Sequence, residues 1–255
     1  MPEHRDNQPQ SDSRRKFLKY SGAAIGGVVV GGVVGGVIGK SLGGKPAEPA
    51  KQPNEAQPEA ADYNQALMFF NQEQFRITEA ATERIFPKDD LGPGAKELGV
   101  AYFIDHQLAG QWGINAQDYM MGPFQKGETT QGDYPSVKRH ELFTMGLQAI
   151  QNLSQQKYKK SFLDLAEAEQ DEVLKALENG ADISLYGTTG QAFFKTLISF
   201  TTEGVYADPL YGGNKNMGGW KMKNYPGNQM SYLDVVDKKE FVKMEPQSLR
   251  DHLSH

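Results

Sequence analysis

The sequence has 255 residues, no cysteine and a formal net charge of −5. The lack of cysteine excludes disulfide bonds, thiolate iron–sulfur ligands, covalently attached c-type haem and a catalytic thiol on this chain. Positions 61–255 carry 19 basic and 26 acidic side chains, a formal charge of −7, which argues against nucleic acid as a partner. These 195 residues suffice for a sizeable core, and we expect one domain.

The first pattern along the chain is a twin-arginine export signal. It comprises Ser13, Arg14, Arg15, Phe17, Leu18 and Lys19, directly before an uncharged stretch from Tyr20 to Gly39. The twin-arginine translocase carries proteins that are already folded, often with a cofactor inserted or a partner attached. The sequence therefore predicts a folded, exported cargo, commonly a redox complex.

The uncharged stretch alternates paired glycines with β-branched residues and is only weakly hydrophobic, which suits a twin-arginine signal. On a helix, Gly27, Gly31, Gly35 and Gly39 would share one face suited to close packing, or glycine merely lowers the hydrophobicity of a disposable signal. Residues 22–39 would span about 27 Å as a helix, enough for a thin bilayer. Ser41-Leu42-Gly43 is a marginal cleavage site, so a cleaved signal and an uncleaved anchor both fit.

Four parts follow from composition: a signal at 1–42, a linker at 43–61, a helical domain at 62–230 and a tail at 231–255. The linker is rich in Pro, Ala and Glu and nearly free of large apolar residues. Such a segment cannot bury enough surface to fold, and its prolines favour an extended, disordered spacer.

Helical periodicity dominates the domain, and no stretch alternates over strand length. Predicted helices cover 71–86 with Asn71 as N-cap and Gln74 completing a capping box, 95–110, 135–153 with Pro135 at its start, 167–179 before Gly180, and 189–203. The fold class is therefore all-α, a single domain of five or six helices.

Residues 204–227, the glycine–aromatic segment, read as a long irregular loop after the last of these helices. Glycines let backbones approach closely, and Tyr211, Trp220 and Tyr225 offer large surfaces at low entropic cost, a composition suited to protein recognition. Together with Asp208, these residues are our candidate partner interface. An equally weighted alternative is that the segment plugs the helical domain, and both hold if one face packs inward.

Motifs for chemistry are sparse. The sequence contains no Gly-x-Gly-x-x-Gly turn after a strand for a dinucleotide and no Gly-x-Ser-x-Gly elbow. Asp105-His106 and His140-Glu141 could meet across two helices as metal ligands, but their spacing matches no metal motif. Better explanations are an ordinary polar surface, or Asp105 as a cap on neighbouring backbone. Asp89 and Asp90, beside Gly92-Pro93-Gly94, are expected to fix a turn. We expect no catalytic, cofactor or metal site on this chain.

Several short strings resemble the gluconate 2-dehydrogenase subunit 3 family. The most specific is Asp208-Pro-Leu-Tyr-Gly-Gly-Asn214, followed by Gly219-Trp220 and Tyr225-Pro-Gly227; Ile85-Phe-Pro-Lys-Asp89 and Tyr102-Phe-Ile-Asp105 agree with it. The resemblance covers about 69–227 and implies a small subunit beside a flavoprotein dehydrogenase of the glucose-methanol-choline type, which carries FAD. A cytochrome c subunit with haem c often completes such complexes.

The function expected from these observations is a non-catalytic small subunit that escorts its flavoprotein through twin-arginine export and holds it at the outer face of the cytoplasmic membrane. The substrate, a sugar or a sugar acid, would be read by the partner. The alternatives are an autonomous exported enzyme and a membrane-tethered binding protein; a stoichiometric flavoprotein on the purified chain separates the first reading from both.

Overall fold

The computed structural model describes residues 65–253 except 126, 129, 131–135 and 181. That part of the chain is helical, with eight α-helices, three short 3₁₀ helices and isolated bridges in place of strands. Six of the α-helices lie within the predicted 62–230 domain, so the all-α prediction is confirmed. The predicted signal, linker and Pro135 helix start fall outside the described residues. None of the described helices combines the length and apolar character needed to cross a membrane.

The first two described helices show where local signals suffice and where they fail. α2 (Gln72–Ile85) begins with the predicted capping box, in which Gln74 N donates to Asn71 Oδ1 at 2.9 Å and Asn71 N to Gln74 Oε1 at 3.1 Å. α3 (Val100–Ala109) begins five residues later than predicted, which corrects the start at 95. The cause is Gly99, whose left-handed φ of 70° separates a turn from the helix.

The next three helices follow the predicted periodicity. α4 (Arg139–Tyr158) begins four residues after the predicted start at 135, because residues 136–138 lie outside the helix and Lys138 is its N-cap, and it extends beyond the predicted end at 153. η2 (Phe162–Asp164) precedes α5 (Glu167–Glu178), which stops before Gly180 as predicted. α6 (Gly190–Tyr206) is capped by the Thr189 hydroxyl, which accepts from Ala192 N at 3.2 Å.

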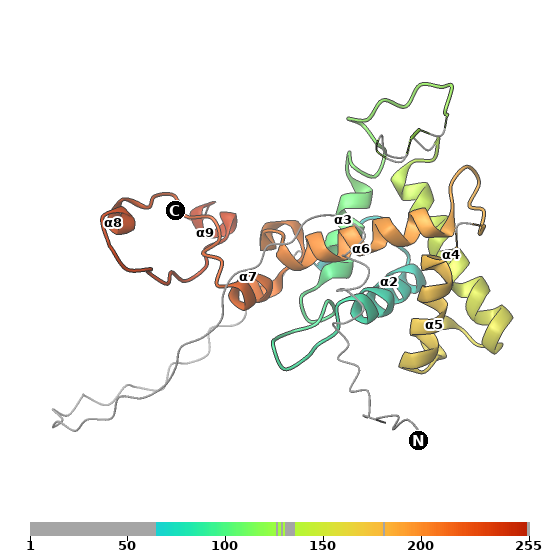
Figure 1. Cartoon of the computed structure of the whole chain (residues 1–255), viewed down its shortest axis with the longest axis horizontal. Helices are drawn as coiled ribbons and strands as arrows, with labels where there is room; N and C mark the ends of the chain where they lie inside the picture. Colours follow the sequence, from blue (N-terminus) through green and yellow to red (C-terminus); the bar gives the residue numbers. More distant parts are fainter. Residues whose placement is uncertain (1–64, 126, 129, 131–135, 181, 254–255) are drawn as a thin grey trace, which may run out of the picture.

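Helix α6 is the central element of the fold and contacts α2, α3, α4, α5 and α7 (Figure 1). Its apolar face is buried against aromatic rings, with Phe193 edge-on to Phe143 of α4 at 5.5 Å and Phe200 tilted against Trp112, in the turn after α3, at 3.7 Å between ring centroids. This face belongs to one core cluster with buried residues of α2, α3, α4 and α5.

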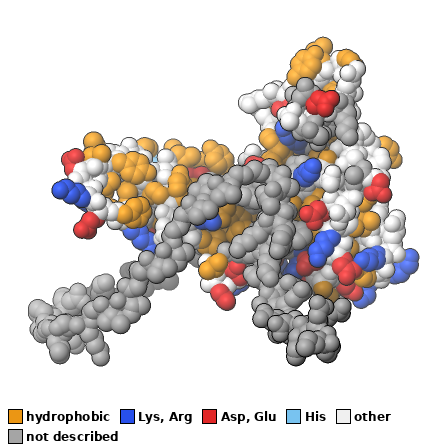
Figure 2. Space-filling model, in the orientation of Figure 1, with side chains coloured by type: hydrophobic (Ala, Val, Ile, Leu, Met, Phe, Trp, Pro, Cys, Tyr) orange, Lys and Arg blue, Asp and Glu red, His pale blue; other side chains and the backbone are white. Residues whose placement is uncertain are grey.

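The glycine–aromatic segment is more regular than the loop predicted for it. It contains η3 (Pro209–Tyr211), η4 (Lys215–Met217) and α7 (Gly218–Lys223), and its first three residues belong to α6. Beyond it, α8 (Leu233–Val236) and α9 (Leu249–Leu253) lie in a projection to the left of the helical body in Figure 1. We name residues 228–247 the C-terminal arm. Figure 2 shows hydrophobic side chains gathered on this projection.

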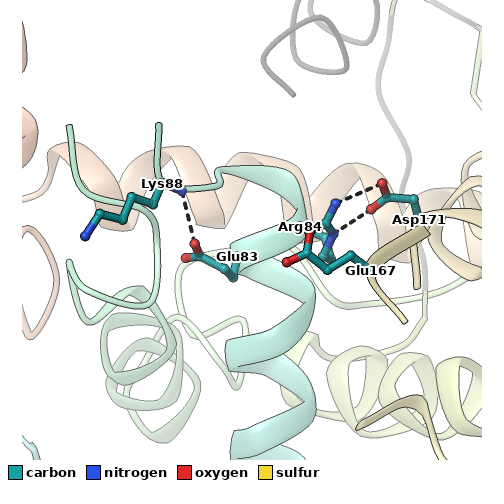
Figure 3. Close-up of polar contacts among 5 residues, drawn as sticks. All are labelled: Glu83, Arg84, Lys88, Glu167 and Asp171. Atoms are coloured by element: carbon teal, nitrogen blue, oxygen red, sulfur yellow. Dashed lines mark hydrogen bonds and ion pairs between the residues drawn. The ribbon is translucent and has the colours of Figure 1, made fainter. Parts of the chain in front are cut away.

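Arg84 joins α2 to α5 (Figure 3). Its Nε and Nη2 donate to the two carboxylate oxygens of Asp171 at 2.7 and 2.9 Å, and its Nη1 lies 2.7 Å from Glu167 Oε2. The hydrogen bonds to Asp171 raise the pKa of the Arg84 guanidinium above its already high value. On the preceding residue, the Glu83 carboxylate accepts from Lys88 N at 3.0 Å and fixes the turn after α2.

Replacing Arg84 with lysine should lower the free energy of unfolding of the full chain by about 1–2 kcal/mol, because an ammonium group cannot donate to Asp171 through two parallel bonds and reach Glu167 as well. Urea denaturation measures the change. Arg76→Lys, the same substitution at an exposed position of α2, should stay within about 0.5 kcal/mol. Equal effects of the two substitutions would show that the link between the helices is energetically negligible.

Candidate functional site

The glycine–aromatic segment folds back over the carboxyl end of α6, and Asn214 holds it there. This side chain is fully buried; its Nδ2 donates to Ala207 O at 2.8 Å and its Oδ1 accepts from Gly219 N at 2.7 Å. The Asn214 backbone adopts a left-handed φ of 48°, which asparagine tolerates better than most residues. One side chain therefore closes residues 207–219 into a loop.

Two glycines of the segment lie directly against the α6 backbone. A Cβ at Gly213 would lie 2.3 Å from Gly204 O, and one at Gly219 would lie 2.0 Å from Val205 O. Any larger residue would push the segment off the helix end, because the obstacle at both positions is backbone that cannot move aside. The glycines of the family-like string thus serve close backbone packing.

Trp220 belongs to the interior of this chain. It is 5% exposed, and its Nε1 donates to Tyr206 O at 2.8 Å, which satisfies a carbonyl at the end of α6. Its ring lies edge-on to Tyr225 at 5.4 Å. The alternative prediction, that the segment packs into its own helical domain, is therefore correct for Trp220. The role predicted for Trp220 in a partner interface stays a prediction, and its ring is not exposed.

Tyr211 and Tyr225 are placed differently. They are 48% and 51% exposed, and so present roughly half of each ring to the outside. One face of the segment packs inward through Trp220 and Asn214, while Tyr211 and Tyr225 remain partly exposed; the interface role predicted for the tyrosines stays a prediction. A tyrosine held on a rigid base is well suited to contact another protein.

Asp208 links the segment to the end of the chain. Its Oδ1 accepts from Leu210 N at 2.9 Å, which caps η3, and its Oδ2 accepts from Leu249 N at 2.8 Å, at the start of α9. Both carboxylate oxygens of this candidate interface residue are therefore engaged inside the chain. The tail beyond 231 consequently returns to the domain at α9.

Asp105 anchors the chain where it leads into α2. The carboxylate is fully buried and accepts from Met68 N, Phe69 N and Phe70 N at 2.6, 3.1 and 2.6 Å. The prediction that Asp105 caps neighbouring backbone is confirmed. A buried carboxylate with three amide donors is a stable structural contact, because the donors replace the water that it loses.

The other residues weighed for chemistry are also held by local contacts. His106 Nε2 lies 2.9 Å from Ala66 O, and Glu141 accepts from Lys138 N at 2.9 Å as part of the cap of α4. The prediction that Asp89 fixes a turn is confirmed by the 2.8 Å bond from Leu91 N. Within the described residues, no group of three or more His, Asp or Glu side chains is placed to hold a metal ion.

A concavity of about 530 Å³ lies apart from the segment, between residues 115–120 and the first turns of α4 and α6. Arg139 contributes to it, but this guanidinium is paired with Asp118 at 2.6 Å and lies 4.6 Å over the Trp112 ring. Lys195 and Thr188 complete the polar part of the lining. The charge of Arg139 is thus used to hold residues 112–118 against α4.

Sequence reasoning did not single out Asn214, the residue on which the segment depends most. The available signal was its position directly after Gly212-Gly213, where an asparagine commonly adopts a left-handed conformation. Its two hydrogen-bond partners, at 207 and 219, are set by the folded loop and leave no pattern in the sequence.

The inward and outward aromatics should respond differently to truncation. Trp220→Ala should lower the free energy of unfolding by about 3–5 kcal/mol, because it leaves a cavity and removes the donor to Tyr206 O. Tyr211→Ala, at a half-exposed ring, should cost less than about 1 kcal/mol. Thermal melts followed by circular dichroism compare the two variants with the parent chain, and a stable Trp220→Ala variant would contradict the assignment of Trp220 to the core.

The comparisons with known proteins give one match. The family model described as Gluconate 2-dehydrogenase subunit 3 matches residues 72–227, from the first residue of α2 to the end of the glycine–aromatic segment. No curated protein and no solved structure matches the chain. The matched stretch comprises more than half of the sequence.

Proposed function

Because the chain belongs to the gluconate 2-dehydrogenase subunit 3 family, we propose that it is the non-catalytic small subunit that escorts a flavin-dependent dehydrogenase out of the cytoplasm and retains it at the membrane. Family membership makes it an accessory subunit of a dehydrogenase complex. The escort role, the membrane role and the identity of the partners are the proposal.

The observation that carries the proposal is the use of the family-matched segment. Its most distinctive polar groups form hydrogen bonds within the chain that hold the segment against α6; these groups are Asn214, Asp208 and the Trp220 indole. The backbone held in this way carries the partly exposed rings of Tyr211 and Tyr225. A surface built in this way can bind a protein, whereas none of its polar groups is left in a constellation suited to acid–base or nucleophilic chemistry.

The proposed partner is a flavoprotein of the glucose-methanol-choline type that carries FAD and oxidises a sugar or sugar acid. A cytochrome c subunit with haem c is the proposed third member, passing electrons onward. The partners would carry out the chemistry, while this chain contributes a binding surface and the export signal.

The export signal is the twin-arginine motif with Arg14 and Arg15, which lies outside the described residues. A pathway that moves folded proteins can carry a partner bound to the signal-bearing chain, so one signal serves the complex. The destination would be the outer face of the cytoplasmic membrane, where an uncleaved Gly/Val stretch would act as an anchor and the linker as a spacer.

Replacing both Arg14 and Arg15 with lysine should leave this chain and its flavoprotein together in the cytoplasm, because the translocase reads the guanidinium pair and not charge alone. Cell fractionation with a dehydrogenase assay on each fraction measures the result. Arg5→Lys, a matched change outside the motif, should leave export intact. A flavoprotein that still reaches the outer face beside the double-lysine chain would overturn the escort role.

The full chain purified without its flavoprotein should show no flavin or haem absorbance. The complex purified through this chain should show about one flavin per chain, because the cofactor would enter with the partner. Absorption spectra of the two preparations provide the measurement. A flavin retained by the isolated chain at about one per molecule would contradict a cofactor-free small subunit.

A further inference from the structure

The C-terminal arm is closed at its base by contacts to the glycine–aromatic segment. Asn228 N donates to Gln247 O at 2.7 Å, Gln247 N donates to Pro226 O at 3.1 Å, and His252 Nε2 lies 2.7 Å from Asn228 O. The Asp208 bond to Leu249 N fixes the following helix α9 to η3. Residues 228–247 are therefore a pinned loop, with both ends held on the domain.

The tip of the arm has the opposite character. Every residue from 231 to 241 is exposed except Val235, which is half-buried. The large apolar side chains Leu233, Val236 and Phe241 are 80%, 69% and 88% exposed. Backbone hydrogen bonds in this stretch, such as Val236 N to Tyr232 O at 3.0 Å, stay within the arm. The tip thus holds apolar groups away from the core of its own chain, as Figure 2 shows.

Exposed large apolar side chains gathered in one part of a chain mark a contact with another molecule. Eight of the sixteen exposed large hydrophobic side chains in the described residues lie between Tyr211 and Leu253. The bond from Gln247 N to Pro226 O places the base of the arm beside the end of the segment that carries Tyr225.

Resting on the proposed function, we propose that the C-terminal arm docks on the flavoprotein subunit and extends the contact made by Tyr211 and Tyr225. Leu233, Val236 and Phe241 are its anchors. Pinning at the base reduces the entropy that the arm loses on binding, because its ends are ordered in advance. The arm lies beyond Gly227, where the family match ends.

The charges of the arm favour a protein over a lipid surface. It carries four acidic and three basic side chains, Asp234, Asp237, Glu240, Glu245, Lys238, Lys239 and Lys243. This near balance gives little attraction to anionic headgroups, which recruit clusters of lysine and arginine. At four residues, α8 is also too short to lie stably in a bilayer surface as an amphipathic helix.

The test compares the full chain with its Leu233→Ser/Val236→Ser/Phe241→Ser variant, each titrated against the purified flavoprotein by biolayer interferometry. The triple variant should bind at least about tenfold more weakly, because anchors near the centre of an interface dominate affinity. Thermal stability should be unchanged, because all three side chains are exposed. Tyr119→Ser/Tyr186→Ser, at exposed aromatic positions outside the region, serves as the matched control and should bind like the parent chain.

If the triple variant binds the flavoprotein as tightly as the parent chain does, the proposed docking role of the arm is wrong, and the proposed function is unaffected. If the parent chain itself bound no flavoprotein, the proposed function would fall and the arm with it. Two further measurements identify a different contact for the arm if the triple substitution changes their result and leaves flavoprotein binding unchanged. These are flotation with vesicles of phosphatidylethanolamine and phosphatidylglycerol, which reports lipid contact, and light scattering of the chain alone, which reports contact with a second copy.

Discussion

The carboxyl end of α6 is the constraint on which the rest of the structure depends. A helix leaves its last carbonyl groups without intrahelical partners, and this end is covered by protein. The Trp220 indole and the Asn214 amide supply donors to the carbonyls of Tyr206 and Ala207. To bring them there, the chain must reverse within a few residues and lie against the helix backbone, which only glycine at 213 and 219 allows. The composition of the segment follows from this one requirement.

That requirement also decides which residues remain for a partner. Asp208, Asn214 and Trp220 point to contacts within the chain, so their substitution acts first on folding. Tyr211 and Tyr225 keep about half of each ring exposed, although the Tyr225 ring contacts the buried Trp220 ring edge-on. The segment that we expected to be a recognition motif is thus mainly a folding motif, and the proposed binding surface is what remains exposed after the end of α6 is closed.

Local signals explain how much of this could be predicted. The capping box at Asn71 and the stop before Gly180 depend on residues within a few positions of each other, and both were correct. The sequence analysis did not predict α7, because this helix begins with Gly218 and Gly219, and glycine has a low helix propensity. Burial of Trp220 overrides that preference. The partners of Asp105 lie 35 to 37 residues earlier, so its capping role was predictable in kind while its partners were not.

Gly227 separates the part of the chain that holds the core from the exposed arm. Before this residue, side chains such as Asn214 and Trp220 satisfy buried groups of the domain, and their substitution costs fold stability whatever the partner. Gly227 itself is held by the close approach of Gln247 and Trp220. Beyond it, exposed residues such as Leu233 and Phe241 contribute little to the fold, and surface substitutions there usually alter stability by no more than about 0.5 kcal/mol. Substitutions at the tip of the arm can therefore be made without disturbing the domain that supports it, so the proposed contact can be tested separately from the fold.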